Sequence, residues 1–158
     1  MNDTIHDMFT NAGVQRPEDT IGYLMWRVAH RHQREIDRAL ADIDLTHLQF
    51  VALVQTAWML RTQAQVTQPE LATFSNIHPM QLSNVLKALA EKLLLTRPRS
   101  RADSRIKLVV PTPAGIDLLG VALPRAQAVQ RSFFGPPDNA DAIKAALRQI
   151  VASWGDAP

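Results

Sequence analysis

The side chains with the clearest chemical potential are the cations crowded into one short segment. Seven Lys and Arg residues lie between Lys87 and Lys107, against the two acids Glu91 and Asp103, so this segment carries a local charge of +5. The other 137 residues hold ten cations and 13 acids, a charge of −3. A basic segment in an otherwise acidic chain indicates contact with a polyanion such as nucleic acid. A solvated surface loop is the alternative that charge alone leaves open.

Polar side chains beside this segment suit the edges of DNA bases. Gln81 and Asn84 carry amides that can bond bidentately to adenine, while Ser83 and Lys87 suit phosphate or flexible base contacts. An ordinary polar helix face is the alternative, and most contacts in such interfaces go to phosphate. We therefore expect these four side chains to contact DNA as a group.

The arginines that follow are spaced as if along the tip of a hairpin. Arg99, Arg101 and Arg105 alternate with Ser, Ala and Asp residues. An extended arginine can enter a minor groove, where the negative potential is enhanced. These three residues are therefore predicted to contact DNA.

A second group of residues suits a small aromatic ligand. Trp26 and His30 are one helical turn apart and share a face. They could stack on an aromatic ring and bond its carboxylate or hydroxyl, and His47 and Trp58 could complete that pocket. The alternative is that the tryptophans pack in a core or dimer interface and that the histidines are satisfied there.

Several other chemistries are excluded. The chain has no cysteine, which removes disulfides, thiol nucleophiles, thiol redox sensing and Cys-ligated metals. His30 and His32 lie about 200° apart around a helix and cannot bind one ion together. The six glycines form no phosphate-binding loop, and we find no nucleophile with a base and an orienting group. We expect no catalytic residues, no metal and no cofactor, so an enzyme is disfavoured.

The longest uncharged runs, residues 45–60 and 71–86, are 16 residues each. A membrane span needs roughly 20 apolar residues. The N-terminus has no apolar core typical of a signal peptide. We therefore expect a cytoplasmic protein that does not bind membranes.

The pattern of apolar residues and capping signals predicts the elements that position these side chains. Residues 1–18 show no periodicity and are expected to form a loose arm. Capping boxes at Thr46 and Thr67 predict two helix starts, and Thr112 followed by Pro113 predicts a third. The predicted helices span about 20–43, 46–60, 68–74, 79–93, 113–134 and 138–154, with short strands at 95–97 and 106–110. Two short helices joined by a tight turn and followed by a hairpin indicate a winged helix-turn-helix.

The residues at this hairpin carry a resemblance to a known family. Asp103-Ser104-Arg105, followed by residues 109–115 (VVPTPAG), resembles the wing signature D-x-R-x-x-x-V-x-L-T-x-x-G of the MarR family of bacterial transcription regulators. Leu45-Thr46, Gln49-Phe50 and Leu71-Ala72 fall where that family has similar residues, and the match covers about residues 20–132. The chain departs from the pattern at Leu93, where the family often has Gly after the recognition helix, and at Pro111, which replaces a Leu.

The resemblance implies a homodimer that binds a palindromic double-stranded DNA operator and usually represses transcription. It implies that Arg105 enters the groove while Asp103 orients it, and that a small aromatic acid or phenol releases the DNA by binding between the dimer helices and the winged domain. The implied domain is single, with residues 46–112 as the DNA-binding part and residues 20–43 and 113–154 as dimerisation helices.

The expected fold is thus mainly α with a small β-hairpin, a winged helix-turn-helix flanked by dimerisation helices. The expected function is a ligand-released DNA-binding repressor. The alternative is a winged-helix protein-interaction module whose basic wing binds an acidic partner without sequence-specific DNA binding.

Overall fold

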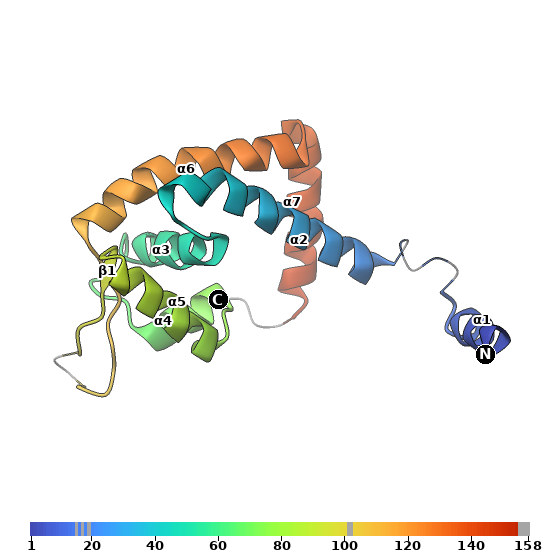
Figure 1. Ribbon diagram of the computed structural model, residues 1–158, viewed down its shortest axis with the longest axis horizontal. Coiled ribbons are helices and arrows are strands. Elements are labelled where there is room, and N and C mark those ends of the chain that lie inside the picture. The colour runs from blue at the N-terminus through green and yellow to red at the C-terminus, as the bar shows by residue number, and fades with distance from the viewer. Residues whose placement is uncertain (15, 17, 19, 101–102, 155–158) are drawn as a thin grey trace. The chain divides into compact units, whose positions relative to one another are not determined.

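The computed structural model describes residues 1–14, 16, 18, 20–100 and 103–154 (Figure 1). The chain forms two compact units, residues 1–35 and residues 36–158. The secondary structure is mainly helical, with one two-stranded antiparallel sheet. This confirms the predicted fold class.

The first unit contains a helix that the sequence analysis missed. Helix α1 spans Asn2–Asn11, within the segment expected to be a loose arm, so that prediction was wrong. Its apolar residues Ile5, Met8 and Phe9 follow helical spacing, but the helix is only ten residues long and has no side-chain N-cap. These three side chains are all exposed. A pattern this short falls below what periodicity can resolve.

Helix α2 spans Ile21–Leu40 and continues from the first unit into the second. It is followed by a single 3-10 turn, η2, at Ala41–Ile43. Asp44 then adopts φ +51, a left-handed conformation that ends the helix. The predicted helix over 20–43 is therefore an α-helix that tightens in its last turn.

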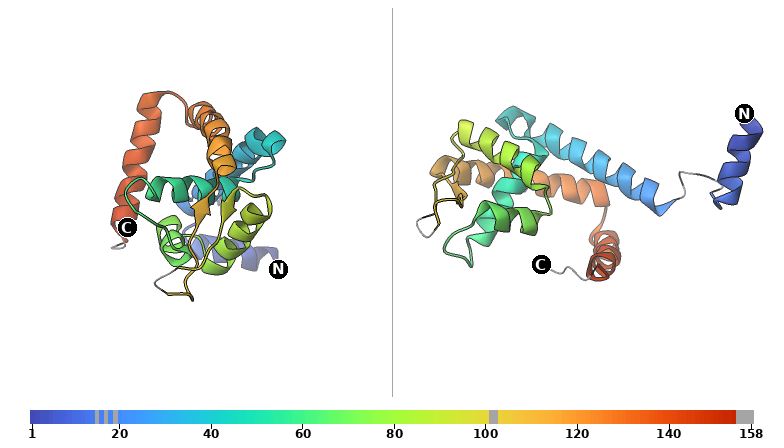
Figure 2. Two further views of the ribbon diagram at one scale, coloured as in Figure 1. Left: turned by 90° about the vertical axis from the view of Figure 1, so that its left-hand side faces the viewer. Right: turned by 90° about the horizontal axis from the view of Figure 1, so that it is seen from below.

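The second unit holds the helix-turn-helix. Helices α3 (His47–Met59), α4 (Gln68–Ser75) and α5 (Pro79–Glu91) begin close to their predicted starts. Both capping boxes are present: the Gln49 and Glu70 amides donate to Thr46 and Thr67 Oγ1, each at 3.3 Å, and the acceptor side chains reach back to the threonine amides. Helix α3 packs against α4, α5 and α6 (Figures 1 and 2).

The end of α5 explains the departure from the family pattern at Leu93. The Leu94 amide donates to the Leu89 carbonyl and the Leu93 amide to the Ala90 carbonyl, each at 3.0 Å. These two bonds form a Schellman motif, which requires a left-handed residue at the Leu93 position. Leu93 indeed has φ +60, and its side chain is 74% exposed. The helix ends as it would with Gly, but a leucine bears the conformational strain.

The hairpin is shorter than predicted and pairs with more than one neighbour. Strand β1 (Leu95–Thr96) pairs antiparallel with β2 (Val110–Pro111), with Leu95 opposite Pro111. Beyond them, isolated bridges join Arg99 with Lys107 and Thr67 with Leu108. Proline cannot donate a backbone hydrogen bond, so Pro98 interrupts a regular ladder. The predicted strand at residues 106–110 therefore pairs partly with the other arm of the hairpin and partly with Thr67, the residue before α4.

Two long helices complete the second unit. Helix α6 spans Pro113–Phe134, as predicted, and α7 spans Pro137–Ala152. The start of α6 is fixed to the end of α5, because the Thr112 amide donates to the Leu94 carbonyl and Thr112 Oγ1 to the Leu93 carbonyl. The amide hydrogen that proline lacks is not needed at position 111. The proline that replaces the leucine of the family pattern therefore leaves the strand end intact.

The core lies within residues 36–126, between α3, α5, the hairpin and α6. Its fully buried large side chains are apolar with the exception of Thr56: Ile36, Leu40, Leu53, Val66, Leu71, Leu82, Leu86, Leu89, Leu95 and Val109. Thr56 Oγ1 donates to the Ala52 carbonyl at 2.7 Å, so its hydroxyl is satisfied. Among the described helices, none is long and apolar enough to cross a membrane.

Candidate nucleic-acid interface

Helix α5 presents a polar face away from the core. Leu82, Leu86 and Leu89 are completely buried, whereas Gln81, Asn84 and Lys87 are exposed. Three of the four residues on this helix that were predicted to contact DNA are therefore accessible. Ser83 is half-buried, and its hydroxyl accepts a bond from Arg97 Nη2 at 3.4 Å.

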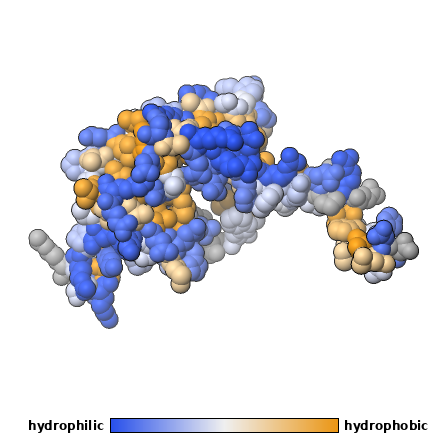
Figure 3. Space-filling model, in the orientation of Figure 1, coloured by the Kyte–Doolittle hydropathy of each residue, from blue (hydrophilic) through white to orange (hydrophobic). Residues whose placement is uncertain are grey.

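Arg99 and Arg105 of the wing are exposed, and the lower left of the molecule, where the wing lies, is hydrophilic (Figure 3). Arg99 Nη1 donates to the Ser104 carbonyl at 3.1 Å, which ties the two arms of the hairpin together. The Ser100 amide donates to the Ile106 carbonyl at 2.8 Å. Arg101, the third predicted wing contact, lies outside the described residues.

Arg105 is oriented by Asp103 through a bidentate pair. Arg105 Nε and Nη2 donate to the two carboxylate oxygens at 3.1 and 2.9 Å, and the Arg105 amide also donates to Oδ1 at 2.9 Å. These bonds lower the pKa of Asp103, the side-chain bond more than the backbone bond. The Arg105 side chain is nevertheless 88% exposed, whereas that of Asp103 is 32% exposed. The half-buried Asp103 carboxylate thus fixes the orientation of the exposed Arg105 guanidinium.

A groove lies between the helix-turn-helix and the wing. Its volume is about 810 Å³, and it is lined by residues of α4, the start of α5 and the wing. The charged or titratable residues in its lining are His78, Arg97, Arg105 and Lys107, with no carboxylate among the lining residues that the structure describes. The groove is therefore a basic concavity that suits a phosphate backbone, with Pro79 and Ser83 of α5 and Arg97 and Arg105 of the hairpin in its lining.

Arg97 is a residue that the sequence analysis did not place at the site. Its Nη2 donates to Gln68 Oε1 at 2.6 Å and to Ser83 Oγ, so it joins the wing to both α4 and α5. Its Nε is buried without a partner among the described atoms. The crowding of cations between Lys87 and Lys107 was the available signal, but spacing could not separate an arginine that points inward from its exposed neighbours.

Lys92 links the other end of α5 to the α2–α3 junction. Its Nζ bonds to the Asp44 backbone carbonyl, to Asp44 Oδ2 at 3.1 Å and to the buried Gln49 Oε1 at 3.1 Å. This cation counted toward the basic segment in the sequence, yet in the structure it fixes the C-terminal end of α5.

The four residues predicted to bind a ligand fall into separate places. Trp26 and His30 lie together on α2, with ring centroids 4.5 Å apart, and His30 Nδ1 is 2.9 Å from the Trp26 carbonyl oxygen. A carbonyl can only accept, so Nδ1 donates and Nε2 is left for another partner. His47 and Trp58 lie at opposite ends of α3, roughly 16 Å apart along the helix axis. One small ring cannot contact both of them within one chain.

The Trp58 ring has a partner of its own. The Arg61 guanidinium lies over it at 4.3 Å from the centroid, while Trp58 remains 58% exposed. His47 is half-buried, and its amide donates to Asp37 Oδ1 at 2.6 Å. Among the residues that the structure describes, no three His, Asp or Glu side chains are grouped closely enough to hold a metal ion.

Comparison with known proteins supports this arrangement. The sequence model of the MarR family matches residues 45–107. The chain is 31% identical over 135 residues to the HTH-type transcriptional regulator YdcH of Bacillus subtilis (strain 168), covering 85% of this chain and 92% of that protein. It is 32% identical over 113 residues to the HTH-type transcriptional repressor Rv2887 of Mycobacterium tuberculosis (strain ATCC 25618 / H37Rv), covering 71% and 75% respectively.

The fold is similar to that of a solved regulator. Bordetella bronchiseptica BpsR, whose structure concerns the regulation of its DNA binding by 6-hydroxynicotinic acid, superposes with a TM-score of 0.76 at 28% identity, covering 86% of this chain and 96% of that one. The chain belongs to the MarR family. It is a DNA-binding transcriptional regulator of the winged helix-turn-helix type and not an enzyme.

Proposed function

We propose that the protein is a homodimeric repressor that binds a palindromic operator and is released from it by a small aromatic acid or phenol. In this proposal residues 46–112 form the DNA-binding part, and the helices of residues 20–43 and 113–154 form the dimer. The observation that carries the proposal is the exposed Arg105 side chain, paired with Asp103, in the lining of a basic groove between α4, the start of α5 and the wing.

The wing and the helix divide the work of DNA binding. Gln81 and Asn84 read base edges in the major groove, and Lys87 and Arg99 bind phosphates. Arg105, held by Asp103, enters the adjacent minor groove. Ser83 contributes through Arg97, whose position it helps to fix. The exposed amides of Gln81 and Asn84 favour DNA over an acidic protein partner, because side-chain amides can bond to base edges as well as carry polar contacts.

The dimer is supported by apolar surface that the single chain leaves open. On α7 and just beyond its end, Leu147, Ile150, Val151 and Trp154 follow helical spacing, and each is at least 39% exposed. On α2, Ile21, Leu24, Met25 and Val28 are each at least 45% exposed. Exposed apolar faces of this kind mark interaction surfaces. Light scattering at micromolar concentration is expected to give about twice the 17.6 kDa of one chain, and a monomer mass would contradict the dimer.

The ligand response is supported by the Trp26–His30 pair and by the relative BpsR, whose DNA binding is regulated by an aromatic acid. The Trp26 ring offers a stacking surface, and His30 Nε2 can accept from a phenol or, when protonated, donate to a carboxylate. His47 and Trp58 contact the ligand only if it spans more than one part of the dimer. A ligand can release the DNA only if it binds the conformation that cannot bind the operator more tightly than the conformation that can.

The proposal is tested by fluorescence anisotropy with an operator selected from random DNA. Binding to this operator should exceed binding to a scrambled duplex by about 10³ or more and weaken steeply with salt. 6-Hydroxynicotinic acid is a suitable first probe for release, with Trp26→Ala as the variant that should lose the response. A flat salt dependence without sequence preference would favour the protein-interaction alternative.

A further inference from the structure

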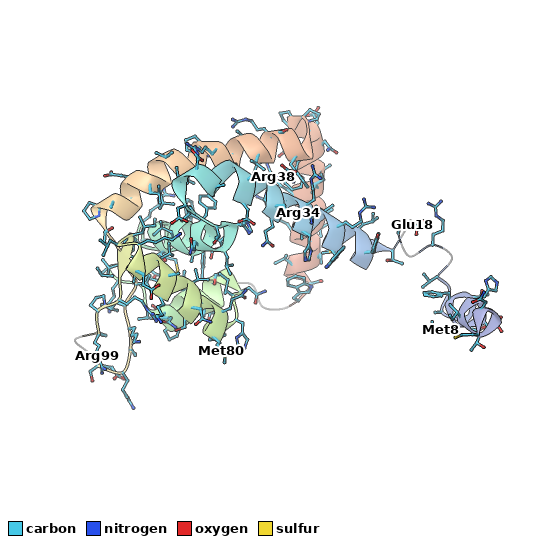
Figure 4. The ribbon with its side chains drawn as sticks, viewed as in Figure 1. Met8, Glu18, Arg34, Arg38, Met80 and Arg99 are labelled. Atoms are coloured by element: carbon cyan, nitrogen blue, oxygen red, sulfur yellow. The ribbon has the colours of Figure 1, made fainter. Side chains whose placement is uncertain are left out.

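We infer that Met80 recognises the C5 methyl group of a thymine in each operator half-site. This inference rests on the proposed operator binding and names one base contact within it. Met80 is the second residue of α5, and its side chain is 71% exposed. Met80 is thus a large apolar side chain that is exposed in the first turn of α5. Figure 4 shows its side chain at the N-terminal end of α5, on the same lower side of the unit as Arg99 of the wing.

Met80 shares a helix face with the polar contact residues. It lies four residues before Asn84 and seven before Lys87, a spacing that places all three on one side of a helix. Asn84 and Lys87 are both exposed. In helix-turn-helix proteins the N-terminal residues of the recognition helix contact base edges. Met80 therefore stands where the α5 face enters the major groove.

The backbone at this position is fixed although the side chain is free. The Met80 amide donates to His78 Nδ1 at 3.3 Å, which caps the helix. Pro79 occupies the first turn and has a restricted φ. The Cα of Met80 is thus held, while an unbranched thioether side chain can adjust to a small apolar target.

The thymine methyl is the apolar group that the major groove offers in unmodified DNA, since the other groups on its base edges are hydrogen-bond donors and acceptors. A methionine cannot satisfy those polar groups but can bury the methyl. Leu93, the other highly exposed apolar residue near this helix, lies just past its opposite end and forms the left-handed turn there.

The test replaces thymine by deoxyuridine, which removes the methyl and leaves every hydrogen-bonding group unchanged. Each thymine of one half-site of the selected operator is replaced in turn, and binding is measured for the wild type, Met80→Ala and Met80→Leu. At one position the replacement should weaken wild-type binding about fourfold, the factor expected for one buried methyl-sized group. Met80→Ala should lose this sensitivity at that position, and Met80→Leu should retain most of it.

Leu93→Ala is the matched control, because it removes an equally exposed apolar side chain near the other end of the helix and should keep the full sensitivity. A wild type that tolerates deoxyuridine everywhere, or a penalty that is the same in Met80→Ala at every position, would overturn the Met80 inference while leaving operator binding intact. Equal binding to all sequences would overturn both the inference and the proposed function. If Met80 is exposed because it contacts an apolar surface of another protein, the wild type should tolerate deoxyuridine at every position.

Discussion

At the scale of single residues, Arg105 carries the clearest prediction. Arg105→Ala should weaken operator binding by about 10- to 100-fold, as expected for a lost charge-assisted contact, and should lower the slope of log affinity against log salt by about one. Its side chain is 88% exposed and donates its hydrogen bonds to Asp103, so the unfolding temperature should change little.

Arg131→Ala is the matched control for this variant, since it removes the same charge from the last turn of α6. Equal loss of affinity in both variants would mean that Arg105 acts through net charge alone. The pairing of Arg105 with Asp103 was expected from the resemblance of Asp103-Ser104-Arg105 to the wing signature of the MarR family. The inward direction of Arg97 was not predictable, because it depends on Gln68 and Ser83 in other elements.

Leu93 carries a prediction about stability, in which a substitution makes the protein more stable. A leucine at φ +60 costs roughly 1–2 kcal/mol, and glycine avoids this strain while losing some of the gain to its freer unfolded chain. Leu93→Gly should therefore stabilise the protein by about 1 kcal/mol, a rise of about 2–4 °C in the unfolding temperature. Calorimetry measures this directly. A lower unfolding temperature would mean that the exposed leucine makes a stabilising contact that outweighs the strain.

At the scale of elements, the join between α5 and α6 depends on Gly115. A Cβ at this position would lie 2.0 Å from the Leu94 carbonyl oxygen, which accepts the Thr112 amide. Gly115→Ala should therefore push the start of α6 away from the hairpin and destabilise the protein by roughly 1–3 kcal/mol.

Gly120 lies in the same helix, and a methyl group added there would meet no described atom within 4 Å outside the adjacent helix backbone. Gly120→Ala is therefore the control and should stabilise α6 by about 0.5–1 kcal/mol. The two variants make the same chemical change in one helix and should shift the unfolding temperature in opposite directions. A neutral Gly115→Ala would show that the close approach to Leu94 is not maintained in solution.

The capping box of α4 predicts a pH dependence. Thr67 donates from its hydroxyl and its amide to Glu70 Oε2, at 2.7 and 2.8 Å, which lowers the pKa of Glu70 from its ordinary value of 4.5. A lowered folded-state pKa stabilises the protein above 4.5, and this contribution is lost as the pH falls through the folded-state value. Glu70→Gln should therefore be less stable than the wild type at pH 7, with a difference that shrinks below about pH 4.5.

Thermal unfolding of both proteins between pH 3.5 and 7 measures this difference. Glu91→Gln, on the surface of α5 with a 3.8 Å ion pair to Lys87, is the control for removing a carboxylate outside a cap. A difference between the wild type and Glu70→Gln that stays constant over this range would contradict the cap. These helix starts were predictable because each capping box is local, whereas α1 was missed because ten residues without a side-chain cap carry little local signal.

At the scale of the whole molecule, most of the elements were predictable from the sequence and their combination into a site was only partly so. Helical spacing and turn residues located α2 to α7 within a few residues, because these signals are contained in each segment. The groove between α4, α5 and the wing depends on contacts across the fold, including the bridge between Thr67 and Leu108. Met80 was not among the predicted contact residues, because those on α5 were chosen for polar or charged side chains that can bond to bases or phosphates.

The measurement that tests the account most directly is a hydroxyl-radical footprint of the full-length protein on its selected operator. A twofold dimer that places its recognition helices in successive major grooves should protect two half-sites centred about 10–10.5 base pairs apart. The half-sites should be related by a palindrome, and both should be lost together when a releasing ligand is added. Protection of a single isolated half-site, or equal protection of all sequences, would contradict a dimeric operator-binding regulator.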